Sequence, residues 1–464
     1  MVVMNLWILT EEHPKTDSLL KILHFFCAEK KICAFFSQIR IVPVLKNGSF
    51  SFTYKVLGCE TPSIKNIFIK TIKGSTSFVD YMLFYQESEP KQSDCPVFLI
   101  EETKTDDKES RNTGVYQRCS KFVIADFYYR DVPKIMFYNL RVTPNEKPTE
   151  TYVFGTRLLL TFGVRILGKN LDPDTFKPFT SIAELVAFKQ KMRKSPKGNT
   201  PFEIVQENDA IRISARLFKS ETLSHDPNIG AVSICCAVIR KLGWDKKIEI
   251  FKHGLRQENL SQRNKCVLIA NRLDFQFENL RLPKAVFPIS YWDYESSGEK
   301  LGTIFMHVTV ENFTNGFSIF DNHAGCEKSY FLTPQKTYTP LQKYADKDAY
   351  KAGDKTKIIF IPDLVLNDID RKTLITIEGK KYENLLAGIK DLENYDSFEK
   401  LYLKSYYPTF KNIRTVILYG SRETNLDNPK IGLLLNADGK MILGIKAPSL
   451  FSEALRNLRG YWNT

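Results

Sequence analysis

The chain has 464 residues, of which 43% are hydrophobic and 26% charged, and it contains no apolar run of the roughly 18 residues needed to cross a bilayer. This composition is that of a soluble globular protein, and the length predicts two or three domains. Lys and Arg outnumber Asp and Glu by 66 to 53, and the net charge of +13 favours a polyanionic partner because bound phosphates release condensed counterions. The nine cysteines form no C-x-x-C pair and the six histidines are scattered, which argues against a disulfide framework, a zinc ribbon or a zinc-protease motif.

The N-terminal part of the chain predicts alternating helix and strand. A helix is expected over 16–30, strand-like runs near 38–57 and 66–72, and the order strand, strand, helix, strand between 77 and 140. The first residues lack a basic leader and are soon followed by two glutamates, so they make a poor signal peptide. We therefore expect a cytoplasmic protein that does not enter a membrane.

The middle of the chain gives weaker signals. Helices are expected over 181–195 and 229–242, and strands with aromatic residues over about 266–333. The segment 334–356 is polar and charged, which predicts a linker or a substrate-facing loop.

A hairpin, a helix and a strand are predicted between 358 and 420. The runs KIIFIPDLVL and TLITIEGK are rich in β-forming residues and are joined by the turn-like sequence NDIDR. Apolar residues then recur at near-helical spacing up to Pro408, and the strand RTVILYG follows. Charged residues interrupt the two otherwise apolar strands at Asp363, Glu378 and Lys380.

These three charges predict a metal site. Period-two geometry places Glu378 and Lys380 on one face of their strand, and Asp363 reaches that face if the two strands pair. Two carboxylates this close repel each other unless a cation lies between them, and hard oxygen ligands suit Mg²⁺. The lysine would position or help to deprotonate a metal-bound water, which is the chemistry of phosphodiester hydrolysis. The alternative is a salt-bridged strand end of purely structural value.

The pattern P-D-x14-E-x-K, on a hairpin followed by a helix and a strand, resembles the PD-(D/E)xK nuclease superfamily. The segment TIEGKKYENLLAGIKDLENYDSFEKLYLKSYYP is similar to the same region of type II restriction endonucleases, and the resemblance covers 357–420. It implies an α/β fold in which a mixed sheet is flanked by helices, the restriction-endonuclease-like core. It also implies Asp363 and Glu378 as ligands of Mg²⁺, Lys380 as the residue that helps to activate water, and products with 5′-phosphate and 3′-hydroxyl ends.

A second segment resembles the same family, so the chain is expected to hold one or two such cores. Asp80 is predicted in a strand with aromatic residues, Glu102 and Lys104 end the strand VFLIEETK, and a helix over about 113–125 precedes the strand KIMFYNL. The resemblance implies Asp80 and Glu102 as metal ligands and Lys104 as a catalytic residue. No proline precedes Asp80, and its connection to Glu102 is longer than in the first pattern. Glu101 is expected to point to the opposite face and to take no part in the site.

Polar side chains near the start of that helix are candidate DNA contacts, because they can hydrogen-bond phosphates or base edges. They are Asn112, Gln117 and Arg118. The basic loops 189–199 and 240–247 and the segment 334–357 are further candidates, with solvated surface charge as the alternative. The predicted organisation is a nuclease-like domain over 1–150, a middle region with DNA-recognition elements over 151–340, and a nuclease-like domain over 341–464.

Together these patterns predict a Mg²⁺-dependent type II restriction endonuclease that cuts both strands of a specific DNA sequence. A monomer with two sites, a homodimer, or one site acting twice would supply the two cuts, and activity at both candidate sites, at either one or at neither stays open. The alternatives are a less specific DNA repair or phage-defence nuclease of the same fold, and a non-catalytic DNA-binding protein on a degenerate nuclease scaffold. No G-x-x-x-x-G-K-[ST] pattern is present, so ATP-driven translocation is not expected.

Overall fold

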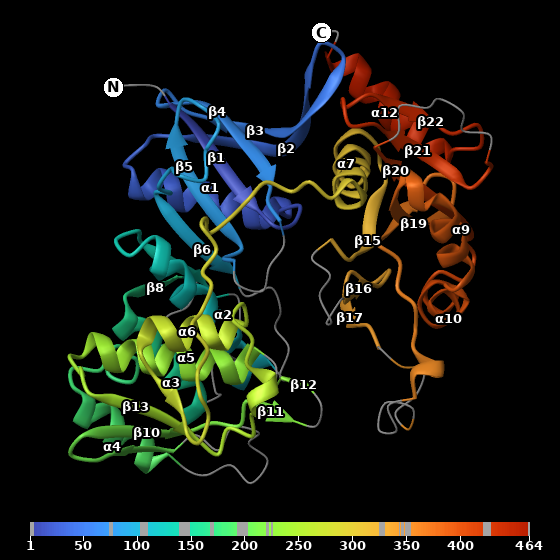
Figure 1. Cartoon of the computed structure of the whole chain (residues 1–464). Coiled ribbons are helices and arrows are strands. Elements are labelled where there is room, and N and C mark those ends of the chain that lie inside the picture. The colour runs from blue at the N-terminus through green and yellow to red at the C-terminus, as the bar shows by residue number, and fades with distance from the viewer. Residues whose placement is uncertain are drawn as a thin grey trace. The chain divides into compact units, whose positions relative to one another are not determined.

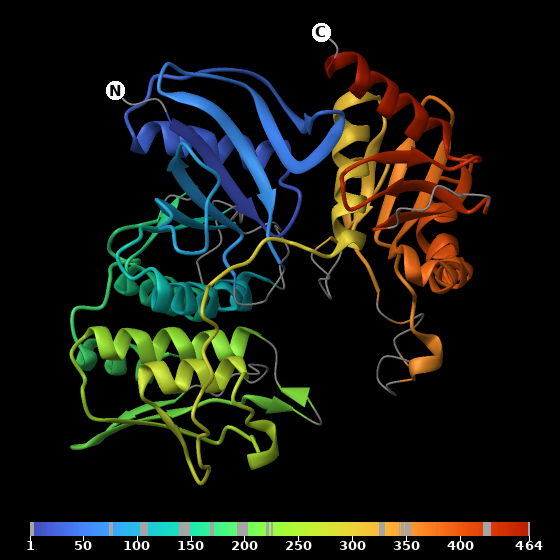
Figure 2. The ribbon, with the colours of Figure 1, turned by 45° about the horizontal axis from the view of Figure 1, so that its top comes forward.

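The computed structural model (Figures 1 and 2) divides the chain into two compact units. Unit 1 comprises Met1–Gly74, Gln86–Glu89 and Tyr294–Thr464, and unit 2 comprises Ser75–Tyr85 and Pro90–Asp293. These units follow a different division of the chain from the three predicted regions. The residues that the structure describes are 4–73, 78–102, 110–138, 149–167, 171–192, 203–219, 222–223, 226–323, 330–342, 344, 348, 354–420 and 428–462.

The N-terminal part of unit 1 is a sheet in the order β2-β3-β4-β1 with one helix beside it. Its elements are β1 (Met4–Thr10), α1 (Thr16–Glu29), β2 (Phe35–Lys46), β3 (Ser49–Glu60) and β4 (Ile64–Thr71). β1 and β4 are parallel, whereas β2, β3 and β4 pair as antiparallel neighbours. The predicted helix and strands of this segment are confirmed.

The C-terminal part of unit 1 is a mixed sheet in the order β15-β18-β19-β20-β21-β22. β18 is antiparallel to both β15 and β19, whereas β19, β20 and β21 are parallel to one another, and β22 is antiparallel to β21. The strands are β15 (Phe317–Asp321), β18 (Leu364–Asp368), β19 (Thr373–Lys381), β20 (Lys411–Tyr419), β21 (Ile431–Leu435) and β22 (Met441–Leu443), and a separate hairpin is formed by β16 (Tyr330–Leu332) and β17 (Tyr338–Pro340).

Helices cover both faces of this sheet (Figures 1 and 2). α7 (Gly298–Phe313) and α12 (Ser449–Trp462) pack together on one face, where α7 contacts β19 and β20. α9 (Leu385–Glu393) lies on the other face, and its Leu392 packs against Val416 and Leu418 of β20. Shorter helical segments follow α9 or flank the hairpin: α10 (Asp396–Phe398), a π-helical turn (Glu399–Leu403), α11 (Lys404–Tyr406), and 3-10 turns at Lys355–Lys357 and Tyr382–Asn384.

Unit 2 begins with a sheet in the order β5-β6-β7-β8, in which β5 and β6 are antiparallel and the remaining pairs are parallel. A second sheet has the order β14-β13-β10-β9, and α5 contacts α2, α3 and α6 above it (Figure 2). The strands are β5 (Tyr81–Gln86), β6 (Phe98–Glu102), β7 (Lys134–Phe137), β8 (Val164–Leu167), β9 (Ile204–Gln206), β10 (Ala210–Ser214), β11 (Phe218–Lys219), β12 (Thr222–Leu223), β13 (Lys247–Phe251) and β14 (Gln276–Phe277). The helices are α2 (Ser110–Tyr128), α3 (Glu150–Phe162), α4 (Ile182–Lys191), α5 (Asp226–Lys241) and α6 (Lys265–Leu273), with a 3-10 turn at Gln257–Asn259.

The fold is therefore mixed α/β, with several mixed sheets flanked by helices, as predicted at that level. The expectation of strands over 266–333 is wrong for most of that segment, because α6 and α7 occupy much of it. The buried β-branched and aromatic residues of α7, such as Ile304, Phe305 and Val308, suit a strand by propensity, but contact with the six-stranded sheet holds them in a helix. Within the part of the chain that the structure describes, no helix is long and apolar enough to span a membrane.

Candidate active site

The hairpin of β18 and β19 brings the first predicted cluster together. Its register pairs Leu364 with Ile377, so Asp363 lies directly before β18 and beside Glu378 in β19. The Asp363 N–H donates to the carbonyl of Ile377 (3.1 Å), and its Oδ2 accepts from the Gly379 N–H (2.8 Å). The backbone of β19 on both sides of Glu378 thus holds Asp363 and fixes the direction of its carboxylate.

Glu378 and Lys380 point to the α9 face of the sheet, as the alternation of β19 predicts. The Lys380 Nζ lies 2.6 Å from Glu378 Oε1 and 3.1 Å from Asp391 Oδ2 of α9. The Tyr395 hydroxyl, just after α9, donates to Glu378 Oε2. The Glu378 side chain is only 8% exposed, so these two donors compensate for removing its charge from water.

Electrostatics separate the roles of the three groups. Burial, together with the charge of Glu378, raises the pKa of Asp363 to about 7. Burial also raises the pKa of Glu378, although Lys380 and Tyr395 act in the opposite direction. Burial opposes the charge on Lys380, but Glu378 and Asp391 outweigh it and raise the pKa of that ammonium. Lys380 is therefore a cation and a hydrogen-bond donor in this arrangement, which suits positioning a ligand oxygen better than removing a proton.

Helix α7 contributes a third carboxylate that the sequence did not indicate. The Glu299 Oε1 accepts from the Lys381 N–H (3.2 Å), and its charge adds to those that raise the pKa of Asp363. This approach requires a glycine at 379, because a Cβ there would lie 2.7 Å from the Glu299 carbonyl oxygen and 2.8 Å from Thr303 Cγ2. The only available signal was the glycine between Glu378 and Lys380, which a close backbone approach explains.

In unit 2 the cluster forms around Asp80, but with different partners from those predicted. Asp80 lies just before β5, and its N–H donates to Glu101 Oε1 (2.9 Å). The Lys121 Nζ of α2 lies 3.1 Å from Asp80 Oδ1 and 3.0 Å from Glu101 Oε1. The expectation that Glu101 turns away from this site is therefore wrong, and Lys121 was not predicted at all.

The neighbouring Glu102 contributes through its backbone, since its N–H donates to Asp80 Oδ2 (2.9 Å). Because side chains alternate along a strand, the Glu102 side chain points away from the face that Glu101 occupies. Lys104 lies outside the described residues. The roles predicted for Glu102 and Lys104 stay predictions, but the charged side chains that meet Asp80 are Glu101 and Lys121.

The two clusters share one backbone arrangement. In each, an antiparallel hairpin is followed by a helix and a strand parallel to the second hairpin strand: β5, β6, α2 and β7 in unit 2, and β18, β19, α9 and β20 in unit 1. In each, an aspartate before the first strand accepts a hydrogen bond from the N–H of the residue that follows a buried glutamate. Glu101 thus occupies the place of Glu378, and the helix supplies the lysine.

Burial is most complete at Glu101. Its side chain is 0% exposed, and burial, followed by the charge of Asp80, raises the pKa of Glu101 to about 8 despite Lys121 and Arg118. The Arg118 Nε lies 3.6 Å from Glu101 Oε2 and donates to the Glu102 carbonyl (3.2 Å). Arg118, predicted as a DNA contact, therefore faces the acidic cluster. Gln117 is half-buried in α2, and the side chain of Asn112, also in α2, lies outside the described residues.

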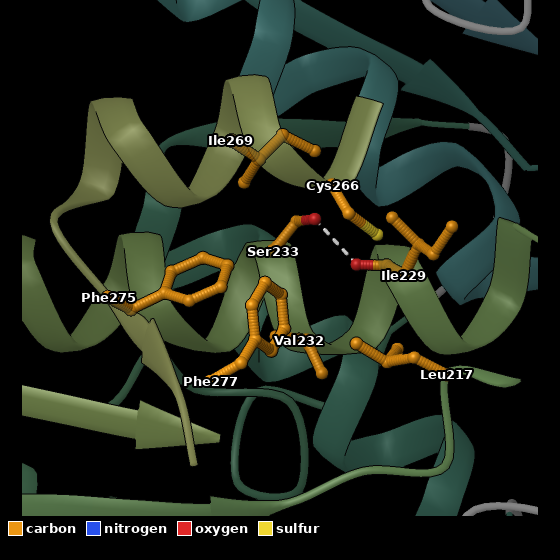
Figure 3. A pocket seen from close by; sticks show the side chains of 8 residues that line it. All are labelled: Leu217, Ile229, Val232, Ser233, Cys266, Ile269, Phe275 and Phe277. Atoms are coloured by element: carbon orange, nitrogen blue, oxygen red, sulfur yellow. Dashed lines mark hydrogen bonds between the residues drawn. The ribbon is translucent and has the colours of Figure 1, made fainter. Parts of the chain in front are cut away.

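A pocket elsewhere in unit 2 offers no comparable chemistry (Figure 3). Its lining is aliphatic and aromatic apart from Ser233 and Cys266. The Ser233 hydroxyl donates to the Ile229 carbonyl within α5 (2.5 Å), and none of the described residues that line the pocket carries a charge. It is a packing defect of the apolar core, and the candidate chemistry of the chain lies in the charged clusters.

No family model, curated protein or solved structure matches this chain.

Proposed function

We propose that this protein is a Mg²⁺-dependent endonuclease that cuts both strands of DNA, of the type II restriction class. The observation that carries the proposal is the trio Asp363, Glu378 and Lys380, of which Glu378 is buried and the other two are half-buried, on a hairpin that is followed by a helix and a parallel strand. Buried charges cost stability, and this cost is tolerated most readily where the charges perform chemistry. The proposal includes a restriction-endonuclease-like core for the C-terminal part of unit 1.

The donor set fits Mg²⁺. Asp363 and Glu378 are hard oxygen donors whose pKa values are raised by burial and, for Asp363, by the charge of Glu378, a repulsion that a divalent cation would relieve. Glu378 Oε1 retains a lone pair beside its contact with Lys380, so it need not lose that contact to act as a ligand. When bound, the ion would lower the pKa of a coordinated water and stabilise charge on the phosphate oxygens.

The side chains around the two carboxylates fix the geometry of the site and can orient a bound phosphate. Lys380 is a cation at the edge of the carboxylate pair, where it can pair with a phosphate oxygen. Tyr395 and Asp391 fix the positions of Glu378 and Lys380 from the α9 side, and the Glu299 carboxylate lies on the α7 side. The net charge of +13 favours association with a polyanion.

The cluster of unit 2 is the basis for a second hydrolytic centre within the proposal. Asp80 and Glu101 would take the places of Asp363 and Glu378, and Lys121 that of Lys380. Two centres in one chain match the two phosphodiester bonds that must be broken in duplex DNA. This assignment replaces Glu102 and Lys104 as the residues whose side chains we expect to carry the chemistry.

Supercoiled plasmid tests the assignment. With Mg²⁺, the unaltered protein should give discrete fragments, and Glu378→Gln or Glu101→Gln alone should leave nicked circles because one strand is cut. Glu102→Gln separates the two assignments in unit 2, since it should still cut both strands. The control Glu258→Gln, whose side chain is 68% exposed, should do the same. A smear of fragments would instead support the less specific nuclease. Retained DNA binding without any cleavage would support the non-catalytic DNA-binding protein and contradict the proposed enzymatic function.

A further inference from the structure

Three of the six histidines of the chain meet in unit 1, although they are far apart in the sequence. His13 follows β1, His307 lies in the middle of α7, and His323 follows β15. Glu311 joins them one helical turn after His307, so that both side chains lie on one face of α7. The cluster is distinct from both carboxylate clusters described above.

The cluster is held close by direct contacts. The His307 Nε2 lies 3.0 Å from Glu311 Oε1, and the His13 Nε2 lies 3.8 Å from Glu311 Oε2. The rings of His13 and His307 meet edge to face with centroids 4.9 Å apart. One nitrogen each of His13 and His307 and one oxygen of Glu311 lie within 4.8 Å of one another.

We propose that His13, His307 and Glu311 bind one Zn²⁺ ion. In tetrahedral zinc sites, Zn–N and Zn–O distances of about 2.0–2.2 Å place neighbouring ligand atoms roughly 3.3–3.5 Å apart. The His307 Nε2 lies 3.0 Å from one oxygen of Glu311 and the His13 Nε2 lies 3.8 Å from the other, on either side of that range, so small rotations of the side chains would bring one oxygen and both nitrogens to the ion. Two imidazoles and one carboxylate favour a borderline transition metal over Mg²⁺, and zinc sites with three protein ligands take water as the fourth.

A second observation supports a ligand here. The His307 Nδ1 lies 2.9 Å from the His323 Nε2, an interaction that orients the His307 ring and leaves its Nε2 facing the proposed ion. His323 is only 7% exposed, and among the residues that the structure describes its Nδ1 has no hydrogen-bond partner. Burying this polar ring costs stability unless it serves another group, and orienting a metal ligand would be such a service.

The cluster is exposed to solvent along one edge. The side chains of His13 and His307 are each 6% exposed, whereas that of Glu311 is 32% exposed, so solvent reaches the carboxylate edge of the cluster. The Ser318 N–H of β15 donates to Glu311 Oε1 (3.0 Å), which fixes the carboxylate from the sheet side. A bound ion would link the end of β1 to α7, two segments nearly 300 residues apart, and so stabilise unit 1 by cross-linking.

The test uses the full-length protein, stripped with a chelator and then given one equivalent of Zn²⁺ or Co²⁺. We expect about one zinc per chain to survive gel filtration, and Co²⁺ to give the visible absorption of a tetrahedral nitrogen and oxygen site without a thiolate charge-transfer band. His13→Gln and Glu311→Gln should lose the zinc and the spectrum. His24→Gln, an exposed histidine of the same unit, should keep both.

The proposal is overturned if the folded, unaltered protein retains no zinc, or if Co²⁺ shows thiolate ligation. It is also overturned if His13→Gln and Glu311→Gln hold zinc as the unaltered protein does. The Co²⁺ spectrum of the unaltered protein decides the matter even if a variant fails to fold. Zinc content should be the same in Glu378→Gln, so failure of the nuclease proposal would leave this result unaffected.

Discussion

Replacing Glu101 by Gln should change the stability of unit 2 in a way that depends on pH. The Glu101 side chain is fully buried, and its pKa is raised from 4.5 to about 8 by burial and by Asp80. A carboxyl group whose pKa is raised on folding favours the folded state at low pH and opposes it once it must ionise there. The unaltered protein should therefore lose stability relative to the variant as pH rises from about 4.5 to 8.

The size of this change in stability follows from the pKa shift of Glu101. One pKa unit corresponds to about 1.4 kcal/mol, so between pH 5 and pH 9 the advantage of the variant should grow by about 3–4 kcal/mol. Gln keeps an oxygen that can accept from the Asp80 N–H and from Lys121, as Glu101 does. The change therefore removes the charge and preserves the hydrogen bonds.

Glu184 provides a control of opposite sign in the same unit. Hydrogen bonds from Thr180, followed by Arg157, lower the pKa of Glu184 to about 2 although burial acts against them. Its contribution to stability is fully present above about pH 4.5 and is lost as pH falls toward 2. Because its side chain is 30% exposed, Glu184→Gln should cost only about 1–2 kcal/mol, and the same amount at pH 5 and pH 9.

Urea unfolding in the presence of a chelator, followed by circular dichroism at both pH values, measures these differences. The transition that both variants shift belongs to unit 2, so separate unfolding of the two units does not confuse the comparison. Glu101→Gln should be more stable than the unaltered protein at pH 9 and close to it at pH 5. An equal effect at the two pH values would refute the argument that ionisation of the buried Glu101 side chain destabilises unit 2.

Three further predictions concern the cluster of unit 1. Gly379→Ala should lower its stability by about 1–3 kcal/mol and slow cleavage, because the new Cβ would lie 2.7 Å from the Glu299 carbonyl oxygen. Gly460→Ala should instead be neutral or stabilising in the same urea titration, because a Cβ there would meet no described atom within 4 Å outside its own helix. Tyr395→Phe removes the hydroxyl donor to Glu378 and should lower the stability of unit 1 by about 1.5–3 kcal/mol. It should also move the acidic limb of the pH–rate profile to higher pH, and an unchanged profile would contradict the positioning role of Tyr395. Because the pKa of Asp363 is about 7 without metal, the Mg²⁺ concentration for half-maximal cleavage should rise about tenfold for each pH unit below 7 and level off above it, and a flat dependence between pH 6 and 8 would count against Asp363 as a ligand.

The sequence predicted the cluster of unit 1 better than that of unit 2, for a physical reason. In β19 the charged residues Glu378 and Lys380 follow a largely apolar run and are two positions apart, so the alternation of side chains predicted that they share one face. In β6 all five residues are buried, including both Glu101 and Glu102, so the polarity pattern could not show which glutamate faces Asp80. The E-x-K spacing favoured Glu102, whereas the hairpin places Glu101 there.

The residues that sequence reasoning missed come from other elements. Lys121 reaches Asp80 from α2, and Glu299 reaches the unit 1 cluster from a helix far upstream of β19. His13 and His307 meet only because β1 and α7 belong to one unit. No local spacing encodes such meetings, since they depend on how sheets and helices pack over long separations in the chain. Local alternation and turn chemistry predicted strands and the hairpin, but they cannot predict contacts between elements that are far apart in the chain.

The most direct test of the proposed function is the cleavage of plasmid DNA by the unaltered protein and by Glu378→Gln, each with Mg²⁺ and with a chelator. We predict discrete fragments with 5′-phosphate ends from the unaltered protein in Mg²⁺, no cleavage in chelator, and only nicked circles from Glu378→Gln. The proposed function would be contradicted if the unaltered protein left the DNA intact in Mg²⁺, or if Glu378→Gln cut both strands at the same rate.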